Sequence, residues 1–211
     1  MTSPGDLIEG FHRFREQHFT DDDALYRQLV EEGQTPKILV VACCDSRVDP
    51  ALVLNCAPGD LFVIRNVANL VPPLESRSGG HHGTSAALEY GVQTLGVEHI
   101  IVLGHAHCGG IRALVQTGVA DNPVSFIDDW MQLVEGARIS VARDMPDASL
   151  EDQMQACEQR AILGSLENLM TFPWVRDRVE QGSLTLHGWY FDMDNGQLLG
   201  YNPATRLFET L

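Results

Sequence analysis

Short apolar runs alternate with longer amphipathic segments through the middle of the chain. The runs at 38–42, 61–64 and 100–103 are rich in branched side chains and are bounded by turn residues, which predicts buried strands of a parallel sheet. Stretches near 83–95 and 110–118 have helical spacing instead. This alternation predicts an α/β fold in which helices flank a mostly parallel central β-sheet.

The start of the chain predicts an N-terminal helical arm over residues 1–33. Ser3-Pro4 suits the beginning of a helix, and apolar side chains then recur at helical spacing over 7–14. A second helix is expected over 21–32, ending near Gly33. Both helices precede the first predicted strand, so they lie outside the alternating part of the chain.

The last third of the chain predicts further helices and then strands. Asn122-Pro123 is expected to open one helix, and Ser149 to cap a longer one that ends near Phe172-Pro173. Alternation from Leu184 onward predicts strands around a turn at Asn195-Gly196.

Length, composition and charge limit the class of protein. The chain has 211 residues, 44% hydrophobic and 20% charged, which predicts a single globular domain over residues 1–211. The formal net charge of −15 disfavours binding to nucleic acid or to an anionic membrane surface. No segment approaches the roughly 18 apolar residues that span a bilayer. We therefore expect neither nucleic acid nor a membrane as a partner.

The chain has five cysteines, an odd number that argues against a disulfide framework. Its first six residues lack the basic and then apolar pattern of a secretory signal. Both observations favour a cytoplasmic protein. In that reducing compartment cysteines are more often buried, catalytic or metal-binding than paired.

Two clusters of reactive side chains follow predicted strands directly. The cluster Cys-Cys-Asp-Ser-Arg occupies 43–47, after the run at 38–42, and Gly-His-Ala-His-Cys-Gly-Gly occupies 104–110, after the run at 100–103. Ligand sites in open α/β sheets form at the carboxyl ends of the strands. The two clusters are therefore expected to meet at one edge of the sheet.

The residue types in the two clusters suit zinc. Thiolate and imidazole ligands favour zinc over magnesium or calcium, and a Cys2His set leaves the fourth tetrahedral position open, which is typical of catalytic sites. His105 and Cys108 are three residues apart, so both can reach one ion across a turn into a helix. The alternative is that these cysteines are small buried residues of the core.

Either Cys43 or Cys44 can supply the remaining thiolate. Residues two apart in an extended segment share a face, so Cys43 would point with Asp45 and Arg47. Asp45 and Arg47 are the pair best suited to catalysis in this cluster, which favours Cys43 as the ligand.

Three motifs together resemble the β-class carbonic anhydrases. They are Cys-x-Asp-x-Arg at 43–47, Arg-Asn-Val-Ala-Asn at 65–69 and His-x-x-Cys-Gly-Gly at 105–110. The motifs occur in the family's order, and the resemblance extends over about residues 34–190, most of the chain.

The resemblance implies an enzyme and assigns roles to residues. Cys43, His105 and Cys108 would bind one Zn2+ per chain, and Asp45 with Arg47 would form the catalytic dyad. The implied reaction is the reversible hydration of carbon dioxide to bicarbonate and a proton, by attack of zinc-bound hydroxide. The resemblance also implies a homodimer or higher homo-oligomer, with residues 1–33 packing on the partner subunit.

The chain looks closer to the plant-like branch of that family. In that branch a glutamine and an apolar pocket hold the substrate, together with a backbone amide. The matching residues here are Gln34, Phe62, Val67, Tyr90 and Gly109.

Two other functions fit the same residues. Relatives of this family hydrolyse carbon disulfide or carbonyl sulfide, and a zinc site of this kind can act on those carbons too. A non-catalytic zinc-binding or bicarbonate-binding protein is the other alternative, although the presence of both Asp45 and Arg47 counts against it.

Overall fold

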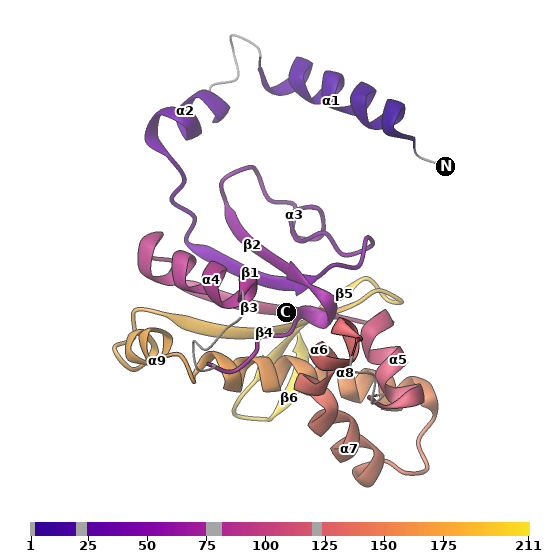
Figure 1. Cartoon of the computed structure of the whole chain (residues 1–211). Coiled ribbons are helices and arrows are strands. Elements are labelled where there is room, and N and C mark those ends of the chain that lie inside the picture. Colours follow the sequence, from indigo (N-terminus) through magenta and orange to yellow (C-terminus); the bar gives the residue numbers. More distant parts are fainter. Residues whose placement is uncertain (1–2, 20–24, 75–81, 120–123) are drawn as a thin grey trace.

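A computed structural model describes residues 3–19, 25–74, 82–119 and 124–211. Its centre is one six-stranded sheet in the order β2-β1-β3-β4-β5-β6 (Figure 1). Neighbours among the first four strands are parallel and the last two strands are antiparallel additions. The strands are β1 (Ile38–Cys43), β2 (Leu61–Asn66), β3 (His99–His105), β4 (Thr185–Asp192), β5 (Gln197–Asn202) and β6 (Leu207–Thr210). The predicted α/β fold with a mostly parallel sheet is confirmed.

Three helices cover one face of the sheet and build the main core. They are α4 (Gly83–Glu89), α8 (Leu150–Leu169) and α9 (Pro173–Glu180). Alternate strand residues such as Leu39, Val41, Ile100 and Val102 point into this core, while Val40, Ala42, Ile101 and Leu103 form a separate buried cluster. Burial on both faces explains why these strands are apolar without interruption.

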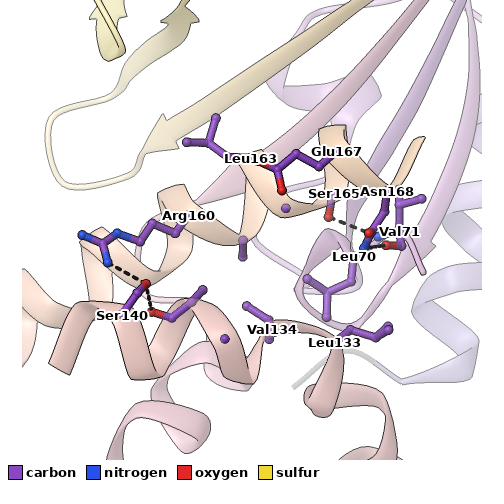
Figure 2. A pocket seen from close by; sticks show the side chains of 14 residues that line it. Leu70, Val71, Leu133, Val134, Ser140, Arg160, Leu163, Ser165, Glu167 and Asn168 are labelled. Atoms are coloured by element: carbon purple, nitrogen blue, oxygen red, sulfur yellow. Dashed lines mark hydrogen bonds between the residues drawn. The ribbon is translucent and has the colours of Figure 1, made fainter. Parts of the chain in front are cut away.

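A second group of helices gathers at the carboxyl ends of β1 and β3. It contains α5 (Gly109–Thr117), α6 (Phe126–Met131), the 3-10 turn Gln132–Val134 and α7 (Glu135–Asp144), which packs on α8 (Figure 1). Their apolar residues form a core cluster that includes Cys43 and Cys108. A cavity of about 400 Å3 lies between α7 and α8 (Figure 2), and none of the predicted site residues lines it.

Helix α8 lies very close to the sheet because two glycines leave room for one side chain. A Cβ on Gly104 of β3 would lie 2.7 Å from Cδ1 of Ile162, and one on Gly188 of β4 would lie 2.9 Å from its Cγ2. Ile162 is fully buried. The close approach brings the preceding turn of α8 within reach of the loop that follows β3.

The N-terminal helices α1 (Pro4–His18) and α2 (Leu25–Glu32) bury no residue of their own, and α1 lies apart from the sheet (Figure 1). The predicted start of α1 is confirmed, because Ser3 and Asp6 form a reciprocal capping box. The expected beginning of the second helix at residue 21 lies outside the described residues, and α2 is described from Leu25.

Several elements differ from the predictions. The helix expected from Asn122-Pro123, a dipeptide outside the described residues, begins at Phe126 with Ser125 as its N-cap, and α7 is a separate helix. Helix α8 ends at Leu169, before the predicted Phe172-Pro173. The predicted helical stretch near 83–95 is confirmed, as α4 and a π-helical turn (Tyr90–Thr94) that continues it. The elements that the sequence patterns did not predict are α3 (Pro50–Val53), the 3-10 turn Val67–Asn69, α9 and β6. Within the described part of the chain, no helix has the length and apolar character needed to cross a membrane.

Candidate metal centre and active site

The three predicted zinc ligands lie together at the carboxyl ends of two neighbouring parallel strands. Cys43 ends β1, His105 ends β3, and Cys108 is the N-cap residue of α5. The two sulfur atoms and a ring nitrogen of His105 all lie within 4.8 Å of one another. The residues are only 5%, 1% and 2% exposed, respectively. The sheet thus brings into one buried group side chains that are far apart in the sequence.

The orientation of His105 fits a metal ligand. Its Nδ1 donates a hydrogen bond to the main-chain carbonyl of Ala106 at 2.8 Å, which leaves the Nε2 lone pair available. Nε2 is buried and has no hydrogen-bond partner among the residues that the structure describes. An orphaned buried nitrogen is costly unless a ligand satisfies it, and metal-binding histidines commonly have their other nitrogen fixed by a carbonyl in this way.

The two thiols also fit a cation. Contact with Cys108, and then with His105, lowers the pKa of Cys43 to about 4, although burial acts in the opposite direction. The hydrogen bond to Cys43, together with burial, raises the pKa of Cys108. Two thiols in contact do not both ionise readily when they are buried, and a divalent cation would stabilise both as thiolates. A Cys2His donor set that leaves the fourth position open is typical of catalytic zinc sites.

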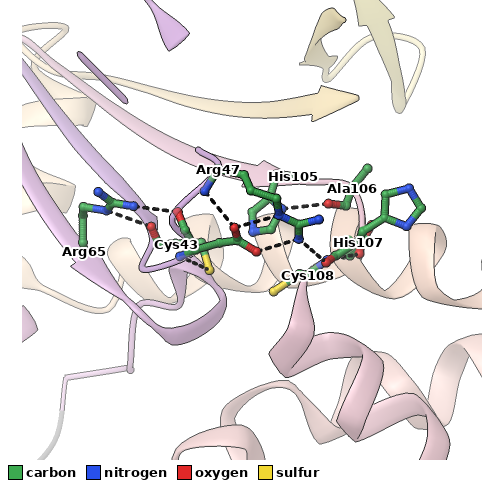
Figure 3. A network of polar contacts seen from close by, with 9 residues as sticks. Cys43, Arg47, Arg65, His105, Ala106, His107 and Cys108 are labelled. Atoms are coloured by element: carbon green, nitrogen blue, oxygen red, sulfur yellow. Dashed lines mark hydrogen bonds and ion pairs between the residues drawn. The ribbon is translucent and has the colours of Figure 1, made fainter. Parts of the chain in front are cut away.

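Asp45 and Arg47 form a bidentate pair beside this group (Figure 3). Arg47 donates from Nε to Oδ1 of Asp45 at 2.9 Å and from Nη2 to Oδ2 at 2.7 Å. The side-chain hydrogen bonds of Arg47 hold the pKa of Asp45 well below its usual range. Arg47 also donates to the carbonyl of His107 at 3.0 Å, which ties the first loop to the second. The ring of His107 pairs instead with Asp194, at 2.7 Å.

A buried carboxylate that the sequence patterns did not single out supports the Cys108 loop. Glu158 of α8 accepts a hydrogen bond from the Cys108 amide at 2.8 Å and another from the Tyr190 hydroxyl at 2.8 Å. Burial raises the pKa of Glu158. One sequence signal was available, because Glu158 lies four residues from both Met154 and Ile162 on the apolar face of its helix.

Two of the five predicted substrate-binding residues lie at the metal end of the sheet. Gly109 opens α5 directly after Cys108, and a Cβ on it would meet no atom within 4 Å, so its surroundings are open. Val67 belongs to the core cluster that contains Cys43 and Cys108. Its position is fixed by a hydrogen bond of 2.8 Å from Trp130 to its carbonyl.

The other three predicted substrate-binding residues lie toward the opposite end of the sheet. Phe62 pairs with Leu39, four residues before Cys43, which corresponds to about 13 Å along the strand. Its ring contacts that of Tyr90 with centroids 5.9 Å apart, and Tyr90 is 45% exposed. Gln34 precedes β1 and is exposed. A single chain therefore does not bring these three side chains to its own metal group.

The sheet and the buried Cys2His group together define an α/β protein with a zinc site of the catalytic type. The profile of the family described as carbonic anhydrase matches residues 38–198, and the chain belongs to this family, in its β class. The resemblance found in the three sequence motifs is thereby confirmed.

Relatives agree with this assignment. The chain is 44% identical over 187 residues to β carbonic anhydrase 5 of Arabidopsis thaliana, described as chloroplastic, a match that covers 89% of this chain and 61% of that protein's length. It is 38% identical over 202 residues to a carbonic anhydrase of Synechocystis, covering 96% of this chain and 72% of the relative. The chain therefore spans less than two thirds of the Arabidopsis relative.

Solved structures show the same fold. The β-carbonic anhydrase CcaA superposes with a TM-score of 0.88 at 36% identity, covering 97% of this chain and 90% of that one. One of two tetrameric β-carbonic anhydrases from Sordaria macrospora gives a TM-score of 0.75 at 28% identity, covering 93% and 92%.

Proposed function

We propose that this chain catalyses the reversible hydration of carbon dioxide to bicarbonate and a proton. The observation that carries the proposal is the buried Cys2His group, with its orphaned His105 Nε2, directly beside the Asp45–Arg47 pair. Zn2+ held by Cys43, His105 and Cys108 would supply the Lewis acidity that makes water a nucleophile near neutral pH.

Asp45 acts as a fixed hydrogen-bond acceptor for the attacking water. Its two oxygens are held by the Arg47 guanidinium, and its pKa lies well below the usual range, so it is ionised at any pH at which the enzyme would work. An ionised acceptor in a fixed position orients the donor and directs a lone pair at the substrate carbon. The bond from Arg47 to the His107 carbonyl keeps this geometry constant relative to the Cys108 loop.

Gly109 and Val67 suit the two forms of the substrate. Carbon dioxide is small and apolar, and the Val67 side chain is an apolar wall beside the metal group. Bicarbonate is an anion, and the Gly109 amide stands at the beginning of a helix of nine residues, where unpaired N–H groups favour negative charge. The absence of a side chain at Gly109 leaves that amide accessible.

Stopped-flow hydration of carbon dioxide by the zinc-loaded protein tests the proposal. We expect rapid turnover at mildly alkaline pH that is lost in Cys108→Ser together with the bound zinc. One zinc per chain without carbon dioxide turnover would contradict it. Turnover of carbon disulfide or carbonyl sulfide would then identify a hydrolase on the same fold. Inactivity on all three substrates would identify a non-catalytic zinc-binding or bicarbonate-binding protein.

We further propose that a second copy of the chain completes each active site. Phe62, Tyr90 and Gln34 are at least partly exposed and lie away from their own metal group. Phe62 is on β2, an edge strand of the sheet, and Tyr90 contacts it, while Gln34 precedes β1. Apposition of two β2 edges would place them at the partner's metal group. The tetrameric relatives from Sordaria support a homo-oligomer, and the unburied helix α1 supports an arm over residues 1–33 that packs on the partner.

Complementation between two inactive variants tests the shared site. Cys108→Ser removes a metal ligand and Phe62→Ala removes the pocket wall, and each homo-oligomer is expected to have little activity. When both chains are co-expressed, a mixed dimer contains one site with an intact metal group and an intact Phe62, so activity should return. Activity equal to the sum of the separate variants would contradict the shared site.

We also propose a cytoplasmic location. All five cysteines are free in the structure, as expected in a reducing compartment. Fractionation of the cells that produce the protein, with detection by antibody, tests this location, and recovery in an organelle or secreted fraction would contradict it.

A further inference from the structure

Arg65 of β2 contacts the main chain on both sides of Cys44, in the segment that carries Cys43 and Asp45 (Figure 3). Its Nε donates to the carbonyl of Cys43 at 2.9 Å, and its Nη2 donates to the carbonyl of Asp45 at 2.8 Å. Its Nη1 pairs with Oδ2 of Asp49 at 2.8 Å. The side chain is 28% exposed, so solvent competes only partly for these contacts.

The segment from Cys43 to Asp45 needs such support because it leaves the sheet. The last main-chain bond to β2 is donated by Cys44 to Asn66, at 2.9 Å. Beyond it, the main chain of Asp45 is held within its own turn by the Val48 amide at 3.2 Å, and from outside by Arg65. Arg47 fixes the Asp45 side chain and ties this turn to the loop that follows β3, whereas Arg65 ties the main chain of the turn to β2.

We propose that Arg65 is a positioning residue for the reaction, which fixes the spacing between the Cys43 ligand and the Asp45 carboxylate through their main chain. The inference rests on the proposed function and adds a residue to it. The two arginines then have different roles. Arg47 orients the Asp45 carboxylate, and Arg65 anchors the turn that carries it.

The geometry requires arginine rather than positive charge alone. The three contacts leave the planar guanidinium in three directions, from Nε, Nη1 and Nη2, to acceptors on three different residues. A lysine ammonium is a compact charge on a flexible stem and does not reproduce this fork. Arg65→Lys should therefore resemble Arg65→Gln in its effect on the reaction.

The test compares Arg65→Gln and Arg65→Lys with the matched control Arg178→Gln. Arg178 of α9 also donates to two main-chain carbonyls, those of Val92 and Ser183, both at 2.9 Å, but near the opposite end of the sheet. We expect kcat to fall by about 100-fold in both Arg65 variants with KM changed little, because misplacement by about 1 Å can have that effect. Arg178→Gln should lower the unfolding midpoint and leave kcat unchanged.

A spectroscopic measurement separates positioning from a general loss of stability. With Co2+ in place of zinc, the thiolate-to-cobalt absorption reports the geometry of the two cysteine ligands, and Cys43 is the one whose main chain Arg65 contacts. It should change in both Arg65 variants and remain as in the wild type in Arg178→Gln. A wild-type kcat and cobalt spectrum in Arg65→Gln, full recovery in Arg65→Lys, or an equal loss in Arg178→Gln would each overturn the proposal.

A second variant covers the case in which Arg65→Gln does not fold. Asp49→Asn removes the charge from one of the three partners of Arg65, and we expect a smaller fall in kcat with a smaller spectral change. Wild-type behaviour of both Asp49→Asn and Arg65→Lys would overturn the positioning role. If the wild-type protein does not hydrate carbon dioxide, the proposed function fails, while the cobalt spectra still decide whether Arg65 fixes the Cys43 segment.

Discussion

Among the buried residues of α8, Glu158 is the one that carries a charge. It is 4% exposed, and each of its oxygens accepts one hydrogen bond, from the Cys108 amide and from the Tyr190 hydroxyl. A buried carboxylate is tolerated only when its hydrogen bonds are made. Glu158 thus links a metal ligand to both α8 and β4, and its removal would leave two buried donors without acceptors.

Replacement of Glu158 by alanine should therefore destabilise the protein by about 2 to 6 kcal/mol, since it leaves two buried donors unsatisfied and each costs about 1 to 3 kcal/mol. The matched variant Tyr190→Phe keeps the bond to Cys108 and leaves one group unsatisfied instead of two, so it should cost about 1 to 3 kcal/mol. Urea unfolding of the two zinc-loaded variants measures this difference. Zinc should also pass to a competing chelator more readily from Glu158→Ala than from Tyr190→Phe, and equal zinc retention would contradict the link to Cys108.

Some residues of the candidate site could be predicted from short sequence motifs, and others could not because their contacts depend on the tertiary structure. The expected ligands and the Asp45–Arg47 pair stand in short motifs directly after strands, so the sequence was sufficient to place them in one group. Glu158 is 50 residues from Cys108, and its contact depends on how closely α8 packs on the sheet. Arg65 stands in a motif that the sequence shows, but its acceptors are main-chain carbonyls, which no residue pattern identifies.

At the scale of elements, the contact between α8 and the sheet determines whether Glu158 reaches the loop that carries Cys108. Ile162 fills the space above Gly104 and Gly188, and it lies one turn beyond Glu158 on the same helix. A methyl group added at either glycine would push α8 away from β3 and β4. Packing of the core and support of the metal ligand therefore depend on the same two glycines.

Gly104→Ala should lower stability by about 1 to 3 kcal/mol, the usual cost of overpacking a core. Ile162→Ala is destabilising on its own, but it removes the side chain that the new Cβ would meet at 2.7 Å. The double variant should therefore be more stable than additivity predicts, by about 0.5 to 3 kcal/mol. Thermal or urea unfolding of the four proteins in this cycle measures the coupling.

Gly200→Ala provides the control for this cycle. A Cβ there would meet Leu211 rather than Ile162, at 2.6 Å. Its effect and that of Ile162→Ala should simply add. Coupling of similar size at both glycines would mean that the interaction with Gly104 is not a local contact.

The strands of the parallel core were predictable because burial on both faces leaves apolar runs that few other elements share. The elements that were missed are short or ambiguous. Strand β6 has four residues, three of them exposed, so its pattern does not alternate. Pro173 was interpreted as the end of the preceding helix, whereas it begins α9, because proline suits both places.

At the scale of the whole molecule, α1 has little support from the described part of its own chain. It buries no residue, and Leu7, Ile8 and Phe11 are 65%, 59% and 56% exposed. An apolar face of this kind is typical of a surface that another subunit covers. Substitutions in α1 can therefore test subunit assembly without disturbing the sheet and the helices packed on it.

Phe11→Asp should weaken assembly, because burial of a phenylalanine contributes about 1.5 to 3 kcal/mol and an aspartate there would be buried without a partner. Gln17→Asp adds the same charge at an exposed polar position of the same helix and should leave assembly unchanged. Light scattering after size-exclusion chromatography, over a dilution series, gives the mass of each variant. Identical masses for both variants at all concentrations would exclude α1 from the interface.

The position of the metal ligands on two paired strands also fixes the order of events during folding. Cys43 and His105 can meet only after β1 and β3 have paired across a long stretch of chain, so the sheet assembles the site. We therefore expect zinc to bind after the protein has folded. The refolding rate should be the same with and without zinc, whereas unfolding should slow down when zinc is bound, because contacts absent from the transition state affect only the unfolding rate.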